Sequence, residues 1–194
     1  NMTGKMSLAG DFSGTVIDAN HFRRDWQGQA SIEMQNTRTE GLNFQQLVQQ
    51  AVERSTDVRA QENYDSATQL DEMTTDIDLD SGILTLSNIR GSSSLMTLNG
   101  KGTLNLLKEE GDLQFAVQVI DGWQGQGKLI DMLKQTAIPL RVYGKWSALN
   151  YSLQVDQILR RQLQNEAKRR LNDWAERNKG TQSGKEVQKL LDKQ

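Results

Sequence analysis

Apolar and polar residues alternate along most of the first 155 residues, and this period of two constrains the fold more than any other feature. Successive side chains of a β-strand point to opposite faces, so alternation predicts strands with one apolar face. The pattern is sharpest where Trp26, Ala30 and Met34 alternate with Gln27 and Gln29. Similar runs lie at residues 6–12, 73–79, 83–89, 96–106, 113–119, 138–146 and 151–155. The turns between these runs are short, which predicts an antiparallel sheet of about eight or nine strands.

Three segments have helical rather than strand periodicity. Residues 43–55 repeat apolar side chains at helical spacing, and Asn43 with Gln46 resembles a capping pair. A short helix is expected at 128–135, and a longer amphipathic helix at 156–177, beginning near Val155. Residues 178–194 are expected to form a flexible basic tail, because the part after the polar linker is too short to hold a helix alone.

Together these elements predict an α+β fold. We expect residues 1–155 to form a twisted, curved antiparallel β-sheet domain, shaped as a groove or half-barrel. The helix at 43–55 and the C-terminal helix at 156–177 are expected to cover an end or an edge of the sheet. Gly100 and Gly102 interrupt one strand, where we expect a bulge or a sharp coil.

The residue types in the chain exclude several kinds of chemistry. Cysteine is absent, which removes thiolate nucleophiles, disulfides and cysteine-ligated metal sites. The one histidine, His21, lies in a segment predicted to be a polar loop. No carboxylate pair sits among apolar residues that would raise a pKa toward catalytic use. We therefore expect no enzyme, no cofactor and no metal site.

Charge is distributed unevenly along the chain. Residues 156–194 hold ten Lys or Arg and six Asp or Glu, whereas residues 1–155 hold 13 basic and 19 acidic residues. An acidic body with a basic tail binds nucleic acid poorly except through the tail, so nucleic acid is not an expected partner.

Residues 122–128 match the first seven positions of a phosphate-binding loop, because Gly122, Gly127 and Lys128 occupy its three defining positions. The next residue, Leu129, lacks the hydroxyl that would hold Mg²⁺. The preceding strand alternates, whereas a strand of a parallel sheet would be apolar throughout. We expect a flexible crossover between strands here, and no bound nucleotide.

Residues 76–82 resemble the start of a calcium loop, with Asp76, Asp78 and Asp80 at the first, third and fifth positions. Gly82 falls at the seventh position instead of the sixth, and Ser87 stands where the bidentate glutamate belongs. In a strand these aspartates share the solvent face, which is the interpretation that we favour.

The predicted helix at 156–177 carries a basic surface beside an apolar stripe. Such a helix can lie at an interface with anionic lipid or bind a partner protein. It can equally pack on the sheet with its basic face in water, and this alternative is favoured because the stripe is needed for packing. The candidate membrane or partner residues are Arg160, Arg161, Lys168, Arg169, Arg170 and Trp174.

Two stretches resemble a known family. Residues 40–52 resemble the G-L-[DN]-h-x-x-L motif at which a helix begins in the AsmA family, and residues 127–146 resemble the closing strand of that family. The intervening order of strand, Asp-Ser-Gly turn, strand, Gly-x-Gly and strand matches as well. The similarity covers most of residues 1–155, and the chain is identified as the C-terminal periplasmic part of a member from an enteric bacterium.

The resemblance implies a location and a function. Members of the family are anchored in the inner membrane by an N-terminal helix, and the rest lies in the periplasm. They are similar to chorein-type bridge-like lipid transfer proteins, in which curved sheets form a groove with an apolar floor. The family is linked to phospholipid traffic toward the outer membrane and to outer-membrane protein assembly, and no member is expected to be an enzyme.

Two functions from different classes follow for this segment. In the first, the apolar strand faces contact the acyl chains of a phospholipid. In the second, the segment is an interaction module that assists outer-membrane protein assembly through its C-terminal helix or a free sheet edge. A simpler alternative is that the same side chains form an ordinary core under the helices. The candidate lipid-contacting residues are Met34, Met73, Ile77, Leu79, Met96, Leu98, Leu104, Leu106, Phe115 and Val117.

Overall fold

The computed structural model describes residues 2–13 and 25–192 of the 194-residue chain. Two compact units make up the chain, Asn1–Val155 and Asp156–Gln194. The polar loop predicted around His21 lies outside the described residues.

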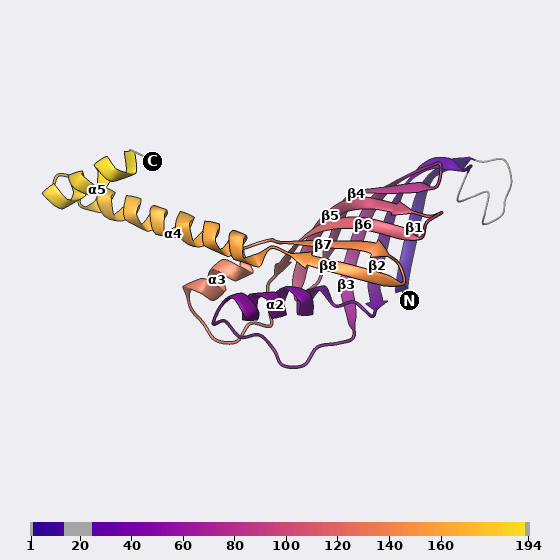
Figure 1. The fold of residues 1–194 in the computed structure, drawn as a ribbon, viewed down its shortest axis with the longest axis horizontal. Helices are drawn as coiled ribbons and strands as arrows, with labels where there is room; N and C mark the ends of the chain where they lie inside the picture. The colour runs from indigo at the N-terminus through magenta and orange to yellow at the C-terminus, as the bar shows by residue number, and fades with distance from the viewer. Residues whose placement is uncertain (1, 14–24, 193–194) are drawn as a thin grey trace. The chain divides into compact units, whose positions relative to one another are not determined.

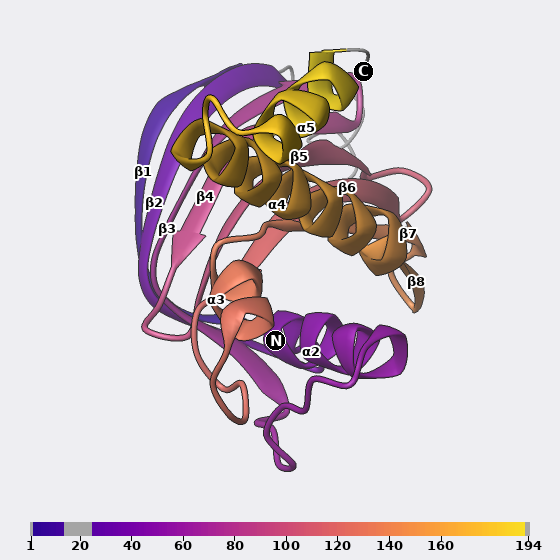
Figure 2. The same cartoon turned by 90° about the vertical axis from the view of Figure 1, so that its left-hand side faces the viewer.

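The first unit contains one antiparallel sheet of eight strands, and each strand pairs with the next strand in the sequence. Among the described strands, β1 and β8 each pair on one side only, so the sheet is open and does not close into a barrel. The sheet curves from β1 round to β8, and α2 and α3 lie across the concave side at one end (Figure 2). The predicted α+β fold with a curved antiparallel sheet is therefore confirmed. The strands are β1 (Met2–Ser13), β2 (Gln27–Glu40), β3 (Ala67–Asp80), β4 (Ile83–Ser92), β5 (Met96–Asn105), β6 (Glu110–Val119), β7 (Ile138–Lys145) and β8 (Ala148–Leu153).

Because pairing is continuous, rows of directly opposed residues run across all eight strands. On one face, two neighbouring rows consist almost entirely of apolar residues and glycines. The row between these two points to the other face and is mostly polar, as the period of two predicts. One apolar row consists of Gly10, Ala30, Ile77, Leu86, Gly102, Leu113, Val142 and Tyr151. The neighbouring apolar row consists of Phe12, Gly28, Leu79, Leu84, Leu104, Gly111, Gly144 and Leu149. The polar row between them consists of Asp11, Gln29, Asp78, Thr85, Thr103, Asp112, Tyr143 and Asn150.

The irregularity predicted at Gly100 and Gly102 is present, but the extra residue lies in the partner strand. The register between β4 and β5 shifts between Leu86 and Ile89, directly opposite the two glycines. A Cβ atom on Gly100 would lie 2.5 Å from the ring of Phe115, so the glycine leaves room for that ring to lie across it. The bulge and the glycines together allow the sheet to coil at this point.

Helix α2 (Phe44–Ser55) begins at the predicted cap. The Asn43 side-chain oxygen accepts a hydrogen bond from the Gln46 backbone N–H at 3.0 Å, which satisfies one of the unpaired N–H groups of the first turn. Helix α3 (Lys128–Lys134) follows β6 as expected. Both helices pack mainly against β6.

The second unit consists of α4 (Val155–Arg177) and α5 (Gln182–Asp192). Helix α4 has the predicted bounds. Within residues 178–194, where a flexible tail was predicted, residues 182–192 form a helix. Thr181 caps α5: its hydroxyl oxygen accepts from the Gly184 N–H at 3.0 Å, and its carbonyl accepts from the Lys185 N–H at 3.1 Å. The cap and the apolar Val187 and Leu191, which are half-buried, outweigh the short length of the segment.

Candidate functional site

The apolar face of the sheet is covered by helices over only part of its area. Phe44 at the start of α2 lies over Phe115 of β6, with ring centroids 5.0 Å apart. The Gln118 side chain donates a hydrogen bond to the Lys134 carbonyl at the end of α3, at 2.7 Å. These contacts place both helices near β6, at the end of the sheet away from the β3–β4 turn (Figure 1).

The covered area is a closed core, which we call the capped part of the face. Its sheet side chains are almost completely buried beneath Val48 and Val52 of α2 and Ile130 and Leu133 of α3, which are buried as well. The members of the capped part are Leu70, Met96, Leu98, Val117, Val119, Ile138 and Leu140.

Outside the capped part, Ala30, Leu79 and Val142 are also buried, but other apolar side chains of the face are exposed or half-buried, and we call these the open part. Its side chains belong to β1–β3 and to the ends of β4 and β5 near their turns. Met6 and Leu8 of the edge strand β1 are 63 % and 57 % exposed. The open part consists of Met6, Leu8, Ile32, Met34, Met73, Ile77, Leu84, Leu86 and Leu104.

Three methionines lie side by side in the open part. Met6 pairs directly with Met34, and Met34 pairs directly with Met73, so the row crosses β1, β2 and β3. Methionine is unbranched and polarizable, and its flexible side chain adapts to apolar ligands of varied shape. This row is the part of the face best suited to a mobile apolar ligand.

The structure separates the ten candidate lipid-contacting residues into two groups. Met96, Leu98 and Val117 are buried in the capped part, and Phe115 lies under Phe44 of α2. Leu79 is buried as well, but it lies beside the β3–β4 turn, away from α2. For these five the alternative of an ordinary core describes the structure. The other five are half-buried: Met34, Met73, Ile77 and Leu104 belong to the open part, and Leu106 lies in the turn after β5.

Sequence reasoning missed the two most accessible members of the open part, Met6 and Leu8. They alternate with Lys5 and Ser7 as expected for a strand, but alternation does not say which strand lies at an edge. The signal that identifies them is their position in the first strand of a sheet whose strands pair in sequence order.

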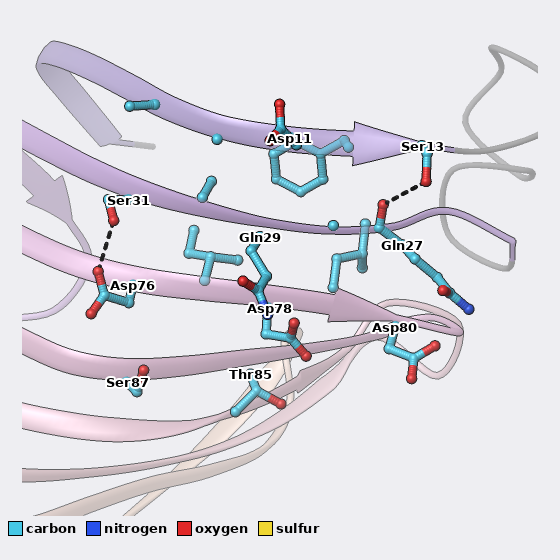
Figure 3. A pocket seen from close by; sticks show the side chains of 17 residues that line it. Asp11, Ser13, Gln27, Gln29, Ser31, Asp76, Asp78, Asp80, Thr85 and Ser87 are labelled. Carbon is cyan, nitrogen blue, oxygen red and sulfur yellow. Dashed lines mark hydrogen bonds between the residues drawn. The ribbon is translucent and has the colours of Figure 1, made fainter.

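The opposite face of the sheet has its own hollow over β1–β4, of about 1030 Å³. Figure 3 shows its polar side chains, including Asp11, Gln29, Ser31, Asp76 and Asp78. Asp76 accepts hydrogen bonds from the Ser31 hydroxyl at 2.9 Å and from the Asn88 side-chain amide at 3.0 Å, and these bonds lower its pKa. The hollow is acidic and already hydrogen-bonded, although Phe12, Ile77 and Leu79 of the apolar rows also contribute to its lining.

The aspartates that resemble a calcium loop all lie on this polar face. Asp76, Asp78 and Asp80 belong to β3, where every second residue is about 7 Å further along the strand, too far apart for one ion to collect all three. No group of three or more potential metal ligands occurs within residues 2–13 and 25–192. Ser81 and Gly82 form the two-residue turn that follows, with φ of 51° and 82°, as type I′ hairpin turns require.

The segment that resembles a phosphate-binding loop lies between two antiparallel strands. β6 runs antiparallel to both β5 and β7, whereas a phosphate-binding loop follows a strand of a parallel sheet. The predicted flexible crossover is instead tied to the loop after α2. The Gln61 N–H donates to the Gly122 carbonyl at 3.0 Å, and the Gln124 N–H donates to the Arg59 carbonyl at 2.8 Å.

Charged side chains on the sheet unit form exposed ion pairs. Arg38 donates two hydrogen bonds to the Asp65 carboxylate, both at 2.7 Å, and a third to Glu40. The Arg38 guanidinium therefore lowers the pKa of both carboxyl groups. Arg141 pairs in the same way with Asp112, whose pKa is also lowered. These shifts arise from structural pairing and not from a poised acid or base.

The candidate membrane or partner residues of α4 are all exposed. Glu166 pairs with Arg169 at 2.7 Å and with Arg170 at 3.4 Å, so part of the positive charge is neutralised. Leu163, Leu171 and Trp174 are exposed on the same helix. Arg160, Arg161 and Lys168 add positive charge to this helix surface.

Within the part of the chain that the structure describes, no helix combines the length and the apolarity needed to cross a bilayer.

These observations define the class of protein: an α+β protein built on an open, groove-like antiparallel sheet with one partly covered apolar face. No protein-family model and no solved structure matches the chain. A curated relative does: the chain is 60 % identical over all its 194 residues to Protein AsmA of Escherichia coli strain K12. The chain spans 31 % of the length of that relative and corresponds to a C-terminal part of it. It therefore belongs to the AsmA family.

Proposed function

We propose that this segment binds phospholipid acyl chains on the open part of its apolar face, as one stretch of a conduit that moves phospholipid toward the outer membrane. The observation that carries the proposal is the pair of apolar rows that cross all eight strands while α2 and α3 cover only one end. A soluble protein rarely leaves so large an apolar surface in water unless it meets a ligand or a partner.

The physical chemistry of the open part suits an acyl chain. Each methylene that leaves water contributes about 0.8 kcal/mol, so several contacts along a floor without polar groups hold a chain firmly enough to compete with water. No charged side chain belongs to the open part, so nothing there fixes a head group at one position. The methionine row adapts to a chain that slides, and a sliding chain is what a conduit needs.

Non-enzymatic action and an envelope location belong to the same proposal. The pKa shifts on the sheet unit come from exposed ion pairs, which supports a role in binding without catalysis. Membership of the AsmA family supports a parent protein that is anchored in the inner membrane and faces the periplasm.

Photo-crosslinking in cells tests the proposal on the full-length protein. A photoreactive residue at Leu8 or Met34, both in the open part, is expected to capture phospholipid. The same residue at Ser7 or Glu33, the neighbouring positions on the opposite face, is the matched control and is expected to capture none. Leu98 in the capped part is also expected to give no lipid. Equal capture at Leu8 and Ser7, or none at both Leu8 and Met34, would contradict the proposal.

A second candidate function is an interaction module that assists outer-membrane protein assembly. The free edges of β1 and β8 and the exposed Leu163, Leu171 and Trp174 of α4 favour it, because open edges and apolar helix faces are common docking surfaces. Mass spectrometry of the purified full-length protein separates the two functions. Co-purified phospholipid supports the conduit, whereas a lipid-free protein that retains a folded partner supports the module.

A further inference from the structure

Three hairpin turns form a continuous rim at one end of the sheet. Residues Ser13, Gln27, Asp80, Ile83, Asn105, Glu110, Lys145 and Ala148 are directly opposed in sequence order and make up the last row of the eight strands. The β3–β4, β5–β6 and β7–β8 turns therefore project beyond the same row. We call residues 80–83, 106–109 and 145–148 the hairpin rim; it lies on the right of Figure 1.

Hydrogen bonds hold the three turns together. The Leu106 N–H donates to the Gly82 carbonyl at 2.9 Å, and the Trp146 N–H donates to the Glu109 carbonyl at 2.9 Å. Within the middle turn, the Asn105 side-chain oxygen accepts from the Leu107 and Lys108 N–H groups at 3.1 and 3.0 Å. The side chains of the rim therefore project from a rigid backbone.

The rim exposes large apolar side chains that the backbone geometry of its turns does not require. Turns are normally polar, with residues chosen for backbone geometry. Here Leu107 is 49 % exposed and Trp146 is 40 % exposed, and Ile83 and Leu149 are also exposed. Ile83 and Leu149 belong to adjacent rows and so point to opposite faces of the sheet, while Leu107 and Trp146 lie in the turns. The exposed apolar side chains therefore surround this end of the sheet on both faces, and a partner is expected there.

The surroundings of these side chains match the chemistry of a lipid surface. Tryptophan and leucine with lysine stems beside them are typical of the boundary between a bilayer and water, where the rings enter and the amines reach outward. Lys108 follows Leu107 and Lys145 precedes Trp146, and the Lys145 amine lies 3.5 Å from the Lys108 carbonyl. Asp80 and Glu109 bring negative charge to the same rim, and Glu110 follows it directly, so the rim complements head groups that carry both signs.

We propose that the hairpin rim docks on a bilayer of zwitterionic phospholipid. The last row of the sheet is next to the apolar row that contains Leu84 and Leu104, so the docked rim brings this end of the open part to the membrane surface. Acyl chains can then pass between bilayer and floor without crossing water. The role of docking in lipid transfer rests on the proposed function. Binding of the rim to a bilayer can be measured whether or not that function is correct.

Tryptophan quenching by vesicles tests the docking. The probe is a phosphatidylcholine vesicle with brominated acyl chains, mixed with a variant of the full 194-residue chain in which Trp146 is the only tryptophan. Bromine quenches an indole that enters the acyl region, so strong quenching of Trp146 is expected. The matched control keeps only Trp123, which is half-buried near α3 with its ring N–H bonded to the Val119 carbonyl at 3.1 Å, and is expected to stay unquenched.

Substitutions locate the docking surface. Leu107→Gln together with Trp146→Ser is expected to weaken vesicle binding by at least about tenfold, because two apolar side chains no longer leave water. Leu95→Gln is the matched control, because Leu95 is 38 % exposed in the β4–β5 turn at the opposite end, and it is expected to change nothing. Circular dichroism verifies that each variant is folded. An unquenched Trp146, equal weakening by Leu95→Gln, or weakening only by Leu171→Gln and Trp174→Ser in α4 would overturn the proposal.

The two proposals can fail separately. If the rim variants bind vesicles normally while Leu8 still captures lipid in cells, only the docking proposal is contradicted. If the rim binds vesicles but Leu8 and Met34 capture no lipid, the conduit proposal is contradicted and the docking proposal is supported.

Discussion

The capped part and the open part belong to one face of the same sheet and show the same alternation. Met34 and Met73 lie in the same row as Leu98, Val117 and Ile138, separated only by Gly91. On one side of Gly91 the side chains are half-buried or exposed, and on the other they are closed off by α2 and α3. An apolar strand face thus becomes core or binding surface according to what lies above it, and its own sequence does not distinguish the two.

The difference also explains how the unit can be stable while leaving apolar surface in water. The capped part supplies a closed core with few exposed atoms, and the stability of the sheet depends on it. The open part is then free to carry an apolar ligand, because its side chains contribute less to folding. Three predictions test this division of roles, in order of expected effect.

The largest effect is expected from the pair Leu98→Ala and Leu8→Ala. Leu98 is only 2 % exposed, so its truncation leaves a cavity and is expected to lower the free energy of unfolding by about 2–5 kcal/mol. Leu8 is mostly in water, and its truncation is expected to cost less than about 0.5 kcal/mol. Urea unfolding monitored by circular dichroism measures both. Similar losses for the two variants would break the distinction between the parts.

A smaller effect is expected from loosening the cap helix itself. Asn43→Ala removes the side-chain acceptor at the start of α2 and is expected to lower the free energy of unfolding by about 1 kcal/mol. A photoreactive residue at Leu98 should then begin to capture lipid in the full-length protein, because α2 opens more often. Thr181→Ala removes the corresponding cap of α5 in the other unit and is the control. If lipid capture at Leu98 rises equally in the Thr181→Ala control, then α2 is not the element that shields Leu98 from lipid.

The smallest effect is expected from the ion pair that anchors the connection between α2 and β3. Arg38 lowers the pKa of Asp65 in the folded state, so the pair stabilises the fold above the unfolded pKa of the carboxyl. This stabilisation is lost as the pH falls below about 4 through the lower folded value. Asp65→Asn is therefore expected to shift the urea midpoint slightly at pH 7 and by less at pH 3, where part of the stabilisation is already lost. A shift of the same size at both pH values would show that the ion pair is not its cause.

Local patterns in the sequence are sufficient for most of the secondary structure. Alternation identified the strands, and the Asn43 cap and the apolar spacing identified α2, because strand and helix periods depend only on nearby residues. The bounds of α4 followed in the same way, and two short stretches were enough to indicate the AsmA family. Helix α5 was not predicted, because the segment is short and the Thr181 cap lies inside a polar stretch that resembles a linker.

Only the tertiary structure decided which apolar residues are core, which are open, and which ends of the strands meet. Leu98 and Met34 look alike in the sequence, and their different exposure depends on where α2 lies, which is set by contacts such as that of Phe44 with Phe115. The hairpin rim brings together Ile83, Leu107 and Trp146 from turns more than 20 residues apart in the chain. The burial of a side chain and its neighbours in space depend on residues that are distant in the chain. A local sequence pattern contains no information about those distant residues.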